Sequence, residues 1–168
     1  MKFVIHSRKY GNHTVIIDDE DAEEVLKHTW YVQHEKRIGR IRFIATKKKI
    51  AINKYSFTTL HHFITGSNYI DHVNGNVFDN RKKNLRKATA SQNNCNRSKP
   101  KNNTSGYKGV TWRERLKKWE ASININKKYY YLGAFKDKEE AAKAYNKLAK
   151  KLHGEFARLN SIKIVGTI

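Results

Sequence analysis

The adjacent residues Asp71 and His72 are the pair in this chain whose types and spacing could carry out chemistry. They lie in a stretch, residues 69–96, that is dense in asparagine and in basic side chains. Hydrolysis of a phosphodiester requires a water molecule that loses a proton and a cation that neutralises the developing charge. A neutral imidazole can take the proton, and a carboxylate can hold a hard divalent cation. The pair therefore indicates metal-assisted phosphodiester hydrolysis, with a polar surface loop as the alternative.

The local backbone must bring the two side chains together. Neighbours on an extended strand face opposite sides, so a bulge or a turn is needed if Asp71 and His72 are to converge. Gly75, flanked by Asn74 and Asn76, offers turn chemistry just downstream. We therefore expect a strand that ends in a turn after His72.

The charge of the chain indicates a polyanionic partner. The 168 residues include 35 Lys and Arg against 15 Asp and Glu, which gives a net charge of +20. Each Lys or Arg placed near a phosphate releases a condensed counterion, so this balance favours binding to a polyanion. Residues 67–105 are nearly free of acids, and a carboxylate there weakens phosphate binding unless it holds a cation. Asp71 stands out for that reason.

Several other classes of protein are disfavoured. The chain contains no long apolar run, so we expect no membrane partner, and its first residues lack the apolar core of a signal peptide. Because Cys95 is the only cysteine, an intrachain disulfide and a cysteine-based zinc cage are both excluded. A reducing, cytoplasmic compartment fits this cysteine content, and no feature indicates a small-molecule substrate.

The order of elements indicates an α+β chain. The first part is β-rich, with a strand at His13 to Ile17, an acidic run at 18–24 that suits a helix start, and a β-hairpin. That hairpin is centred on the apolar residues Ile41, Phe43, Ile50 and Ile52. A short helix follows from Leu60 to Ile64. Residues 97–106 hold the only proline and several turn formers, and we place a linker at 101–106.

Three strands and one helix are predicted after this linker. The strand candidates are "YKGVTWR", "KWEASIN" and "YYYLGAF", and the helix is "KDKEEAAKAYNKLAKKLHG". Asp137 and Glu140 are spaced as a capping box, and Gly154 suits a left-handed position at the helix end. The apolar stripe of the helix comprises Ala141, Tyr145, Leu148 and Leu152. Such a small core requires burial of Trp112, Trp119, Phe135 and Tyr145.

The stretch from the "LHH" segment through residue 96 resembles the HNH endonucleases of the phage and homing type. The matching residues are His61, Asp71, His72, Gly75, Asn80, Asn84, Leu85 and Asn93. The resemblance implies an HNH domain over residues 1–100 with a ββα-metal core at about 57–98, in which a two-stranded ribbon and a helix surround one divalent cation, Mg²⁺ or Mn²⁺. It also implies that Asp71 is a metal ligand and His72 the general base.

The same resemblance assigns the remaining roles. Asn84 is expected to hold the loop that bears the base and to orient its imidazole, and Asn93 to be the second metal ligand through its amide oxygen. Asn94 is the nearest rival of Asn93, and His62 is the rival of His61, the upstream histidine of the family. Basic side chains around the site form either a solvated charge run or a set of phosphate contacts, and we favour the contacts. These are Arg81, Lys82, Lys83, Arg86, Lys87 and Arg97.

The segment from Ser105 to Asn160 resembles the Apetala/ethylene-response-factor DNA-binding domain of plants. Its anchors include Gly109, Trp119, Leu132-Gly133, Ala144-Tyr145 and Asn160. The resemblance implies a domain at 107–160, followed by a tail at 161–168. The domain would be a separate three-stranded antiparallel sheet, packed on one helix and laid in the major groove of double-stranded DNA. Trp119, Ala121 and Ile123 are then expected to face the helix.

The residues expected on the DNA side follow from this alternation, except Lys108, which the resemblance adds. They are Lys108, Thr111, Arg113, Ser122, Asn124, Tyr129 and Tyr131. Lys108, Thr111, Asn124 and Tyr129 stand where the plant domains place arginine, the usual partner of guanine. We therefore expect a different target and binding led by phosphate contacts, with plain β-propensity as the alternative reading of the tyrosines.

Two functions compete. The first is a DNA endonuclease, which by the HNH resemblance would leave 5′-phosphate and 3′-hydroxyl ends, nicking DNA as a monomer or breaking both strands as a homodimer. It would act on DNA in the cytoplasm of a bacterial or phage-infected host cell. The second is a non-catalytic DNA-binding regulator with a decayed nuclease segment. The joint presence of Asp71, His72, Asn84 and Asn93 favours the endonuclease.

Overall fold

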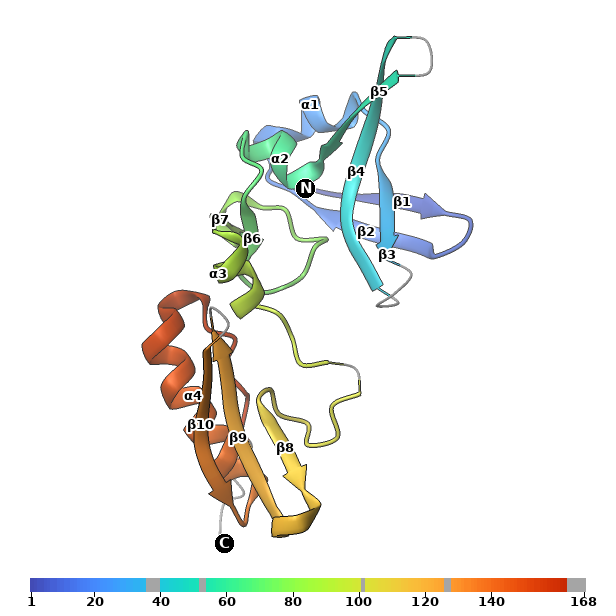
Figure 1. The fold of residues 1–168 in the computed structure, drawn as a ribbon. Coiled ribbons are helices and arrows are strands. Elements are labelled where there is room, and N and C mark those ends of the chain that lie inside the picture. Colours follow the sequence, from blue (N-terminus) through green and yellow to red (C-terminus); the bar gives the residue numbers. More distant parts are fainter. Residues whose placement is uncertain (36–39, 52–53, 101, 126–127, 163–168) are drawn as a thin grey trace, which may run out of the picture. The chain divides into compact units, whose positions relative to one another are not determined.

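The protein is an α+β chain of several small antiparallel sheets and few helices, as predicted (Figure 1). The structure, a computed structural model, describes residues 1–35, 40–51, 54–100, 102–125 and 128–162. Contacts divide the chain into two units, Met1–Ala90 and Ser91–Ile168. The predicted domain boundaries stay a prediction. Ile52, Lys101 of the linker and residues 163–168 of the tail lie outside the described residues.

The first unit begins with a β-hairpin and a short helical segment. β1 (Lys2–Ser7) pairs antiparallel with β2 (Gly11–Ile16), and Gly11 takes a φ of 77° where the chain reverses. The acidic run that follows forms η1 (Asp19–Asp21) and α1 (Ala22–Leu26). Acidic side chains in a first helical turn are favourable because they meet the positive end of the helix dipole.

A three-stranded sheet and a second short helix follow. β3 (Tyr31–Glu35), β4 (Arg40–Ala51) and β5 (Lys54–Thr59) pair antiparallel in that order. α2 (Leu60–Thr65) ends at Gly66, whose φ of 67° is left-handed. The expected hairpin is therefore the β4–β5 pair, and the expected short helix is α2.

One apolar core joins these elements. It comprises the buried residues Ile5, Val15, Ile17, Val25, Trp30, Val32, Ile44 and Leu60. Complete burial of a side chain of this size stabilises a fold by about 1.5–3 kcal/mol. The indole Nε1 of Trp30 donates to the carbonyl of Val25 at 2.7 Å, so its only polar atom is satisfied inside the core.

A two-stranded ribbon closes the first unit. β6 (Ile70–His72) pairs with β7 (Leu85–Lys87), and η3 (Lys82–Asn84) leads into β7. The connection between β6 and β7 is attached to the end of β2. The amide of Ile16 donates to the carbonyl of Phe78, and the amide of Asn80 donates to the carbonyl of Ile16, both at 2.8 Å. The amino-terminal hairpin thus fixes the loop that follows His72.

The second unit holds the predicted three strands and one helix. α3 (Ala90–Cys95) spans the division between the units. β8 (Val110–Arg113), η4 (Glu114–Leu116), β9 (Lys118–Ile125) and β10 (Lys128–Phe135) form an antiparallel sheet in the order β10-β9-β8. α4 (Lys138–His153) packs on this sheet and is followed by η5 (Gly154–Phe156) (Figure 1).

Some details of this unit differ from the sequence-based expectations. Asp137 occupies the N-cap position of α4, but among the described residues its carboxylate makes no capping hydrogen bond. Gly154 has a φ of 54° with a ψ of −126°, which is outside the left-handed helical region. Leu152 is 39% exposed rather than part of the buried stripe, and Ala149 is buried in its place.

Trp112 is also more exposed than expected. It is 37% exposed, whereas Tyr145 is 3% exposed and Trp119 is half-buried. The reason is its position at the edge strand β8, where its ring meets Trp119 at 5.1 Å between centroids and its Nε1 donates to Glu114 at 2.6 Å.

Gly109 provides a test of the packing in the second unit. A Cβ added at Gly109 would lie 2.1 Å from Cδ2 of Tyr145, and the residue has a φ of 74°. We expect Gly109→Ala to lower the free energy of unfolding by at least ~1–3 kcal/mol, the usual cost of overpacking. Chemical denaturation followed by tryptophan fluorescence measures this loss.

Gly106→Ala is the matched control. Gly106 has a φ of 82°, but the nearest atom to an added Cβ is Nζ of Lys99 at 3.9 Å. This variant should lose only the ~1–2 kcal/mol of the positive φ. Equal losses for both variants would show that the approach of Tyr145 does not matter.

Candidate active site

Asp71 and His72 are both buried on β6, with exposed fractions of 3% and 8%. The strand pairs Asp71 with Arg86 and His72 with Leu85 of β7. The turn expected after His72 is present, because Gly75 has a φ of 73° and its amide donates to the carbonyl of His72 at 2.8 Å. The two side chains then meet different partners.

The carboxylate of Asp71 forms an ion pair with Arg86. Nε and Nη2 of Arg86 donate to Oδ2 of Asp71 at 3.0 and 2.7 Å. The Arg86 side chain is only 15% exposed. A charge-assisted contact of this kind, made in a partly desolvated place, fixes the carboxylate and costs several kcal/mol when one partner is removed. Arg86, expected to contact phosphate, thus lies beside the expected metal ligand.

The ring of His72 is oriented by Asn80. Nε2 of His72 lies 3.3 Å from Oδ1 of Asn80, and Nδ2 of Asn80 donates to the carbonyl of Val77 at 2.9 Å. Because that second bond turns Oδ1 toward the ring, and an amide oxygen only accepts, Nε2 carries the proton. The lone pair of the neutral ring therefore lies on Nδ1.

The protonation of His72 depends on opposing effects. Burial lowers its pKa, and the bond to Asn80 and the charges of Asp71 and Asp79 act in the other direction. The net shift is downward, so the ring is neutral near pH 7 and able to accept a proton. The nearby carboxylates then stabilise the imidazolium that results.

His61 packs edge-on against His72. Its ring meets that of His72 edge-on, at 5.5 Å between centroids and 89° between planes, and its Nε2 lies 3.0 Å from Oγ1 of Thr59. Burial, together with the charges of His72 and His62, lowers the pKa of His61 to about 4. His61 is therefore neutral over the physiological range.

Asn84 ties together the loop that follows His72. Its Nδ2 donates to the carbonyl of Asp79 at 2.7 Å and to Oδ1 of Asn74 at 3.1 Å. Its Oδ1 accepts from the amide of Asn74 at 3.0 Å. The side chain is buried, so these bonds form in a place with little competing water. The contacts of Asn84 are with the loop, while the imidazole contact is made by Asn80.

The basic residues of this region divide into two groups. Three of them pair with carboxylates: Arg81 with Asp79, Lys82 with Glu20 and Asp21, and Arg86 with Asp71. Lys83, Lys87 and Arg97 are exposed. The sequence did not reveal the partners of Lys82, because Glu20 and Asp21 come from a distant segment. The pairing of Asp71 with Arg86 follows only once the register of the ribbon is known.

The second metal ligand that the family resemblance implies lies on α3. Asn93 and its neighbour Asn94 belong to the second unit, whereas Asp71 and His72 belong to the first. The pairing of Asp71 with Asn93 therefore stays a prediction. As a donor set, a carboxylate and an amide oxygen are the hard oxygen ligands that Mg²⁺ and Mn²⁺ accept.

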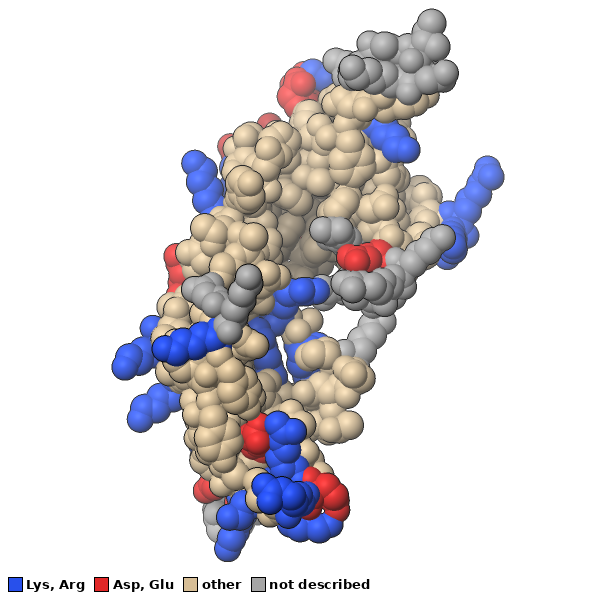
Figure 2. All heavy atoms as spheres, viewed as in Figure 1, with Lys and Arg blue, Asp and Glu red and all other residues tan. Residues whose placement is uncertain are grey.

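The sheet of the second unit presents a polar face. Thr111, Arg113, Asn124, Tyr129 and Tyr131 are exposed, whereas Ala121 and Ile123 are buried. Tyr129 pairs with Asn124, and Tyr131 pairs with the half-buried Ser122. Figure 2 shows Lys and Arg spread over both units on the face in view, with fewer Asp and Glu.

Glu120 organises part of this face. Nε and Nη2 of Arg113 donate to its two carboxylate oxygens at 2.9 and 2.7 Å, and the hydroxyl of Tyr129 donates to Oε1 at 2.9 Å. These contacts hold the pKa of Glu120 below its ordinary value. Sequence reasoning missed Glu120, although its outward position on the strand between Trp119 and Ala121 was the available signal.

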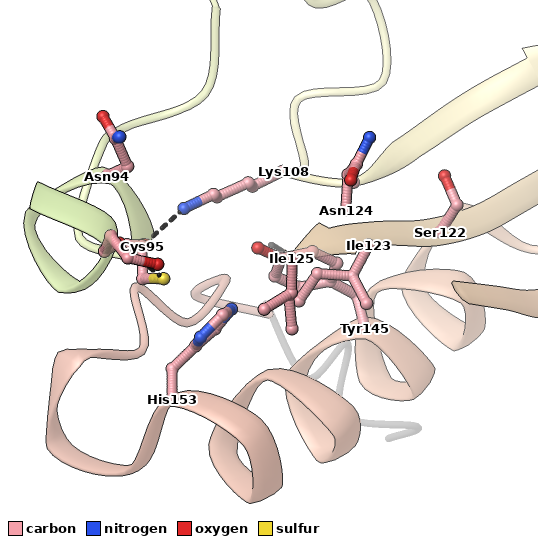
Figure 3. Close-up of a pocket in the computed structure, with 11 residues that line it drawn as sticks. Asn94, Cys95, Lys108, Ser122, Ile123, Asn124, Ile125, Tyr145 and His153 are labelled. Carbon is pink, nitrogen blue, oxygen red and sulfur yellow. Dashed lines mark hydrogen bonds between the residues drawn. The ribbon is translucent and has the colours of Figure 1, made fainter. Parts of the chain in front are cut away.

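Lys108 differs from the other residues expected to face DNA. Its amine donates to the carbonyl of Cys95 at 2.6 Å, and burial lowers its pKa. It lines a pocket of about 510 Å³ together with residues of α3, β9 and α4. Figure 3 shows Lys108 pointing toward Cys95, with Asn94 and Asn124 nearby.

Comparisons with known proteins identify the class of both parts. The family model of the AP2 domain matches residues 105–155. Protein 3.8 of Escherichia phage T7 is 34% identical over 90 residues, which cover 54% of this chain and 74% of that protein. An AP2-like ethylene-responsive transcription factor of Arabidopsis thaliana is 38% identical over 63 residues, 38% of this chain and 13% of that protein.

A further relative covers most of the chain. A protein of Acanthamoeba polyphaga mimivirus named as an uncharacterized HNH endonuclease is 32% identical over 141 residues, 82% of this chain and 70% of that protein. The chain therefore belongs to the HNH endonuclease family, and it carries an AP2 domain. No solved structure matches it. Within the part of the chain that the structure describes, the helices are all too short or too polar to cross a bilayer.

The pKa of His61 leads to a prediction about stability. The folded state keeps this ring neutral down to about pH 4, whereas its ordinary pKa is 6.5. Between these values the unfolded chain binds more protons, so stability is lost as the pH falls. We expect the drop in unfolding free energy between pH 7 and pH 4.5 to be ~2 kcal/mol smaller in His61→Gln than in the parent chain.

Urea denaturation at a series of pH values measures this difference. His6→Gln, at an exposed position of β1, is the control and should follow the parent curve. Parallel curves for His61→Gln and the parent chain would contradict the assignment of this pKa shift to His61.

Proposed function

We propose that this protein is a metal-dependent DNA endonuclease that hydrolyses phosphodiester bonds at sites partly selected by its AP2 domain. The observation that carries the proposal is the buried pair Asp71 and His72 on β6, in which Asn80 directs the ring lone pair to Nδ1. Membership of the HNH endonuclease family supports the same reaction class. By the family resemblance, the products carry 5′-phosphate and 3′-hydroxyl ends.

We further propose that β6, β7 and α3 form a ββα-metal core. They follow one another in the chain in the order that such a core requires. Asp71 would hold one divalent cation, Mg²⁺ or Mn²⁺, together with the amide oxygen of Asn93. A cation bound there neutralises the charge that develops on the phosphate and on the leaving 3′ oxygen.

The chain's own residues then divide the remaining work. His72 takes a proton from the attacking water at Nδ1, which burial keeps unprotonated near pH 7. Asn80 keeps the ring in the reactive tautomer, as a hydrogen-bond partner on the far nitrogen does in other histidine bases. Asn84 holds the loop that carries Asn80, and His61 packs against the edge of the base.

The partner in this proposal is double-stranded DNA. The exposed residues Lys83, Lys87 and Arg97 would contact phosphates near the site. The polar face of the AP2 sheet would contact the duplex through the exposed residues described above. With one catalytic set per chain, a monomer nicks one strand and a homodimer breaks both.

One observation favours a second candidate function. The ion pair between Arg86 and Asp71 neutralises the carboxylate that would hold the cation. A DNA-binding regulator with an inactive nuclease segment would tolerate such a pair permanently. In an active enzyme, the carboxylate of Asp71 must bind the cation while it also accepts hydrogen bonds from Arg86.

Cleavage of supercoiled plasmid separates these functions. With Mg²⁺ or Mn²⁺ we expect nicked or linear product, which a chelator suppresses. Because His72 is the base, His72→Ala should cut roughly 10²–10⁴-fold more slowly, and Asp71→Ala should fall to background. The rate of product formation on agarose gels is the measurement.

The neighbours Asn93 and Asn94 form the matched pair of variants. Asn93→Ala should lose activity and need more metal, because it removes a ligand, whereas Asn94→Ala should cut at nearly the parent rate. If instead Asn94→Ala loses activity and Asn93→Ala does not, Asn94 is the metal ligand. Metal-independent cleavage, or duplex binding with no cleavage under any metal, would favour the second function.

The Glu120 network predicts an effect on duplex binding. In Glu120→Gln the side chain at position 120 is uncharged and holds Arg113 less strongly. Arg113 then becomes available to a phosphate. We expect tighter binding, and a dependence of log K on log salt that is steeper by about one. Titration of a labelled duplex at several salt concentrations measures both.

Glu140→Gln is the control for this change in charge. Glu140 is exposed on α4, and the substitution changes the net charge by the same amount. If both variants change the salt dependence equally, the effect comes from net charge rather than from Arg113.

A further inference from the structure

The three-stranded sheet of the first unit has an outer face that carries aromatic rings. We define the aromatic face as Tyr31, Phe43, Lys47, Tyr55 and Phe57. The register pairs Lys47 with Phe57 and Lys49 with Tyr55, and it pairs Tyr31 with Ala45. Since side chains alternate along a strand, these positions share one side of the sheet. Ile44 and Val32, on the other side, are buried in the core.

Two rings of the aromatic face are exposed, and the rings of Tyr31 and Phe43 are half-buried beside them. Tyr55 is 58% exposed and Phe57 is 47% exposed. Phe57 meets Phe43 at 5.7 Å and Tyr31 at 6.4 Å between ring centroids, at 73° and 63° between planes. Contacts at such angles are edge-on, so Phe57 is not stacked face to face on either neighbour. Clustered exposed aromatics mark an interaction surface rather than a structural need.

The charge of the surrounding strands indicates the kind of ligand. Lys47 lies on the aromatic face, with Nζ 5.9 Å from the ring centroid of Tyr31. In sequence, the three strands contain six Lys and Arg and one carboxylate, Glu35. An apolar protein surface would have to desolvate these charges, whereas a polyanion pairs with them. The ligand is therefore anionic and carries flat groups that stack.

Nucleic acid with unpaired bases has both properties. In a duplex, the faces of the bases are stacked on one another, and a protein reaches only their edges and the phosphates. In a single strand, each base offers a face to an aromatic side chain while the backbone follows nearby positive charge. Exposed aromatic rings beside a lysine on an open sheet therefore suit a single strand better than a duplex.

We infer that the aromatic face binds single-stranded nucleic acid, with bases stacked on Phe57 and Tyr55 and phosphates near Lys47. This surface lies on a different sheet from Asp71 and His72 and on a different unit from the AP2 domain. Its binding needs neither metal nor cleavage. A strand left unpaired beside a bound duplex is the ligand that such a surface would hold.

The test measures binding by the full chain to a fluorescein-labelled oligothymidylate of about 20 nucleotides and to a duplex of the same length, with a chelator present. Phe57→Ala should bind the single strand roughly 5- to 100-fold more weakly, the range expected for loss of one stacked base. Its affinity for the duplex should stay within about twofold. Fluorescence anisotropy gives both constants, and circular dichroism confirms folding.

Four further variants sharpen the result. Val4→Ala removes an apolar side chain of β1 that is 47% exposed, as Phe57 is, and should change neither affinity. Phe57→Trp should keep single-strand binding, whereas Phe57→Leu should lose it, because leucine retains apolar bulk without a π-face. Tyr55→Ala repeats the test at the most exposed ring of the face if Phe57→Ala fails to fold.

Several outcomes would overturn the inference. Unchanged affinity for the single strand in Phe57→Ala and Tyr55→Ala would do so. Full retention of that affinity in Phe57→Leu would do so as well. Equal losses for single strand and duplex would make the face a general phosphate-contact surface. A change from dimer to monomer on size exclusion would make it a self-association surface. Because no cleavage is involved, loss of the nuclease proposal would leave this result intact.

Discussion

The attachment of the β6–β7 loop to the end of β2 is the constraint on which the candidate site depends. Two backbone bonds join Ile16 to Phe78 and Asn80, so the loop takes one course although it contains little regular structure. That course places Oδ1 of Asn80 against the ring of His72. A site needs its catalytic groups held by rigid neighbours to be effective. The amino-terminal hairpin, which carries no residue of the expected catalytic set, supplies that rigidity.

Both units solve the same electrostatic problem in the same way. A chain with a net charge of +20 keeps a buried carboxylate on the paired strands of each unit's polar region, Asp71 on the ribbon and Glu120 on the AP2 sheet. Each is buried and held by an arginine from the paired strand, Arg86 or Arg113. Arginine suits this place because its donors match a carboxylate and its charge persists when desolvated. The pairs keep local repulsion low among the surrounding basic side chains.

The sequence predicted the secondary-structure elements better than it predicted the contacts between their side chains. Turn glycines, alternation and the helix stripe predicted the strands β8 to β10 and the helix α4, because these signals are local. The capping bond of Asp137, the burial of Trp112 and the exposure of Leu152 depend on how elements meet, and there the expectations were wrong. The pairing of Asp71 with Arg86 and the bond from Asn80 to His72 depend on register and on loop course, which no residue pattern encodes.

The composition of the AP2 face limits how much specificity it can supply alone. Thr111, Asn124 and Tyr129 stand on this face where bidentate arginines would read guanine, and Arg113 is engaged by Glu120. In the function proposed above, such a face would contact phosphates more than bases and would bring the chain to DNA with little discrimination. Site choice would then arise from several weak contacts engaged together. When one surface of the chain binds DNA, it raises the effective concentration of the other surfaces near that DNA. A DNA site that contacts all of the surfaces is therefore favoured over a site that contacts only one.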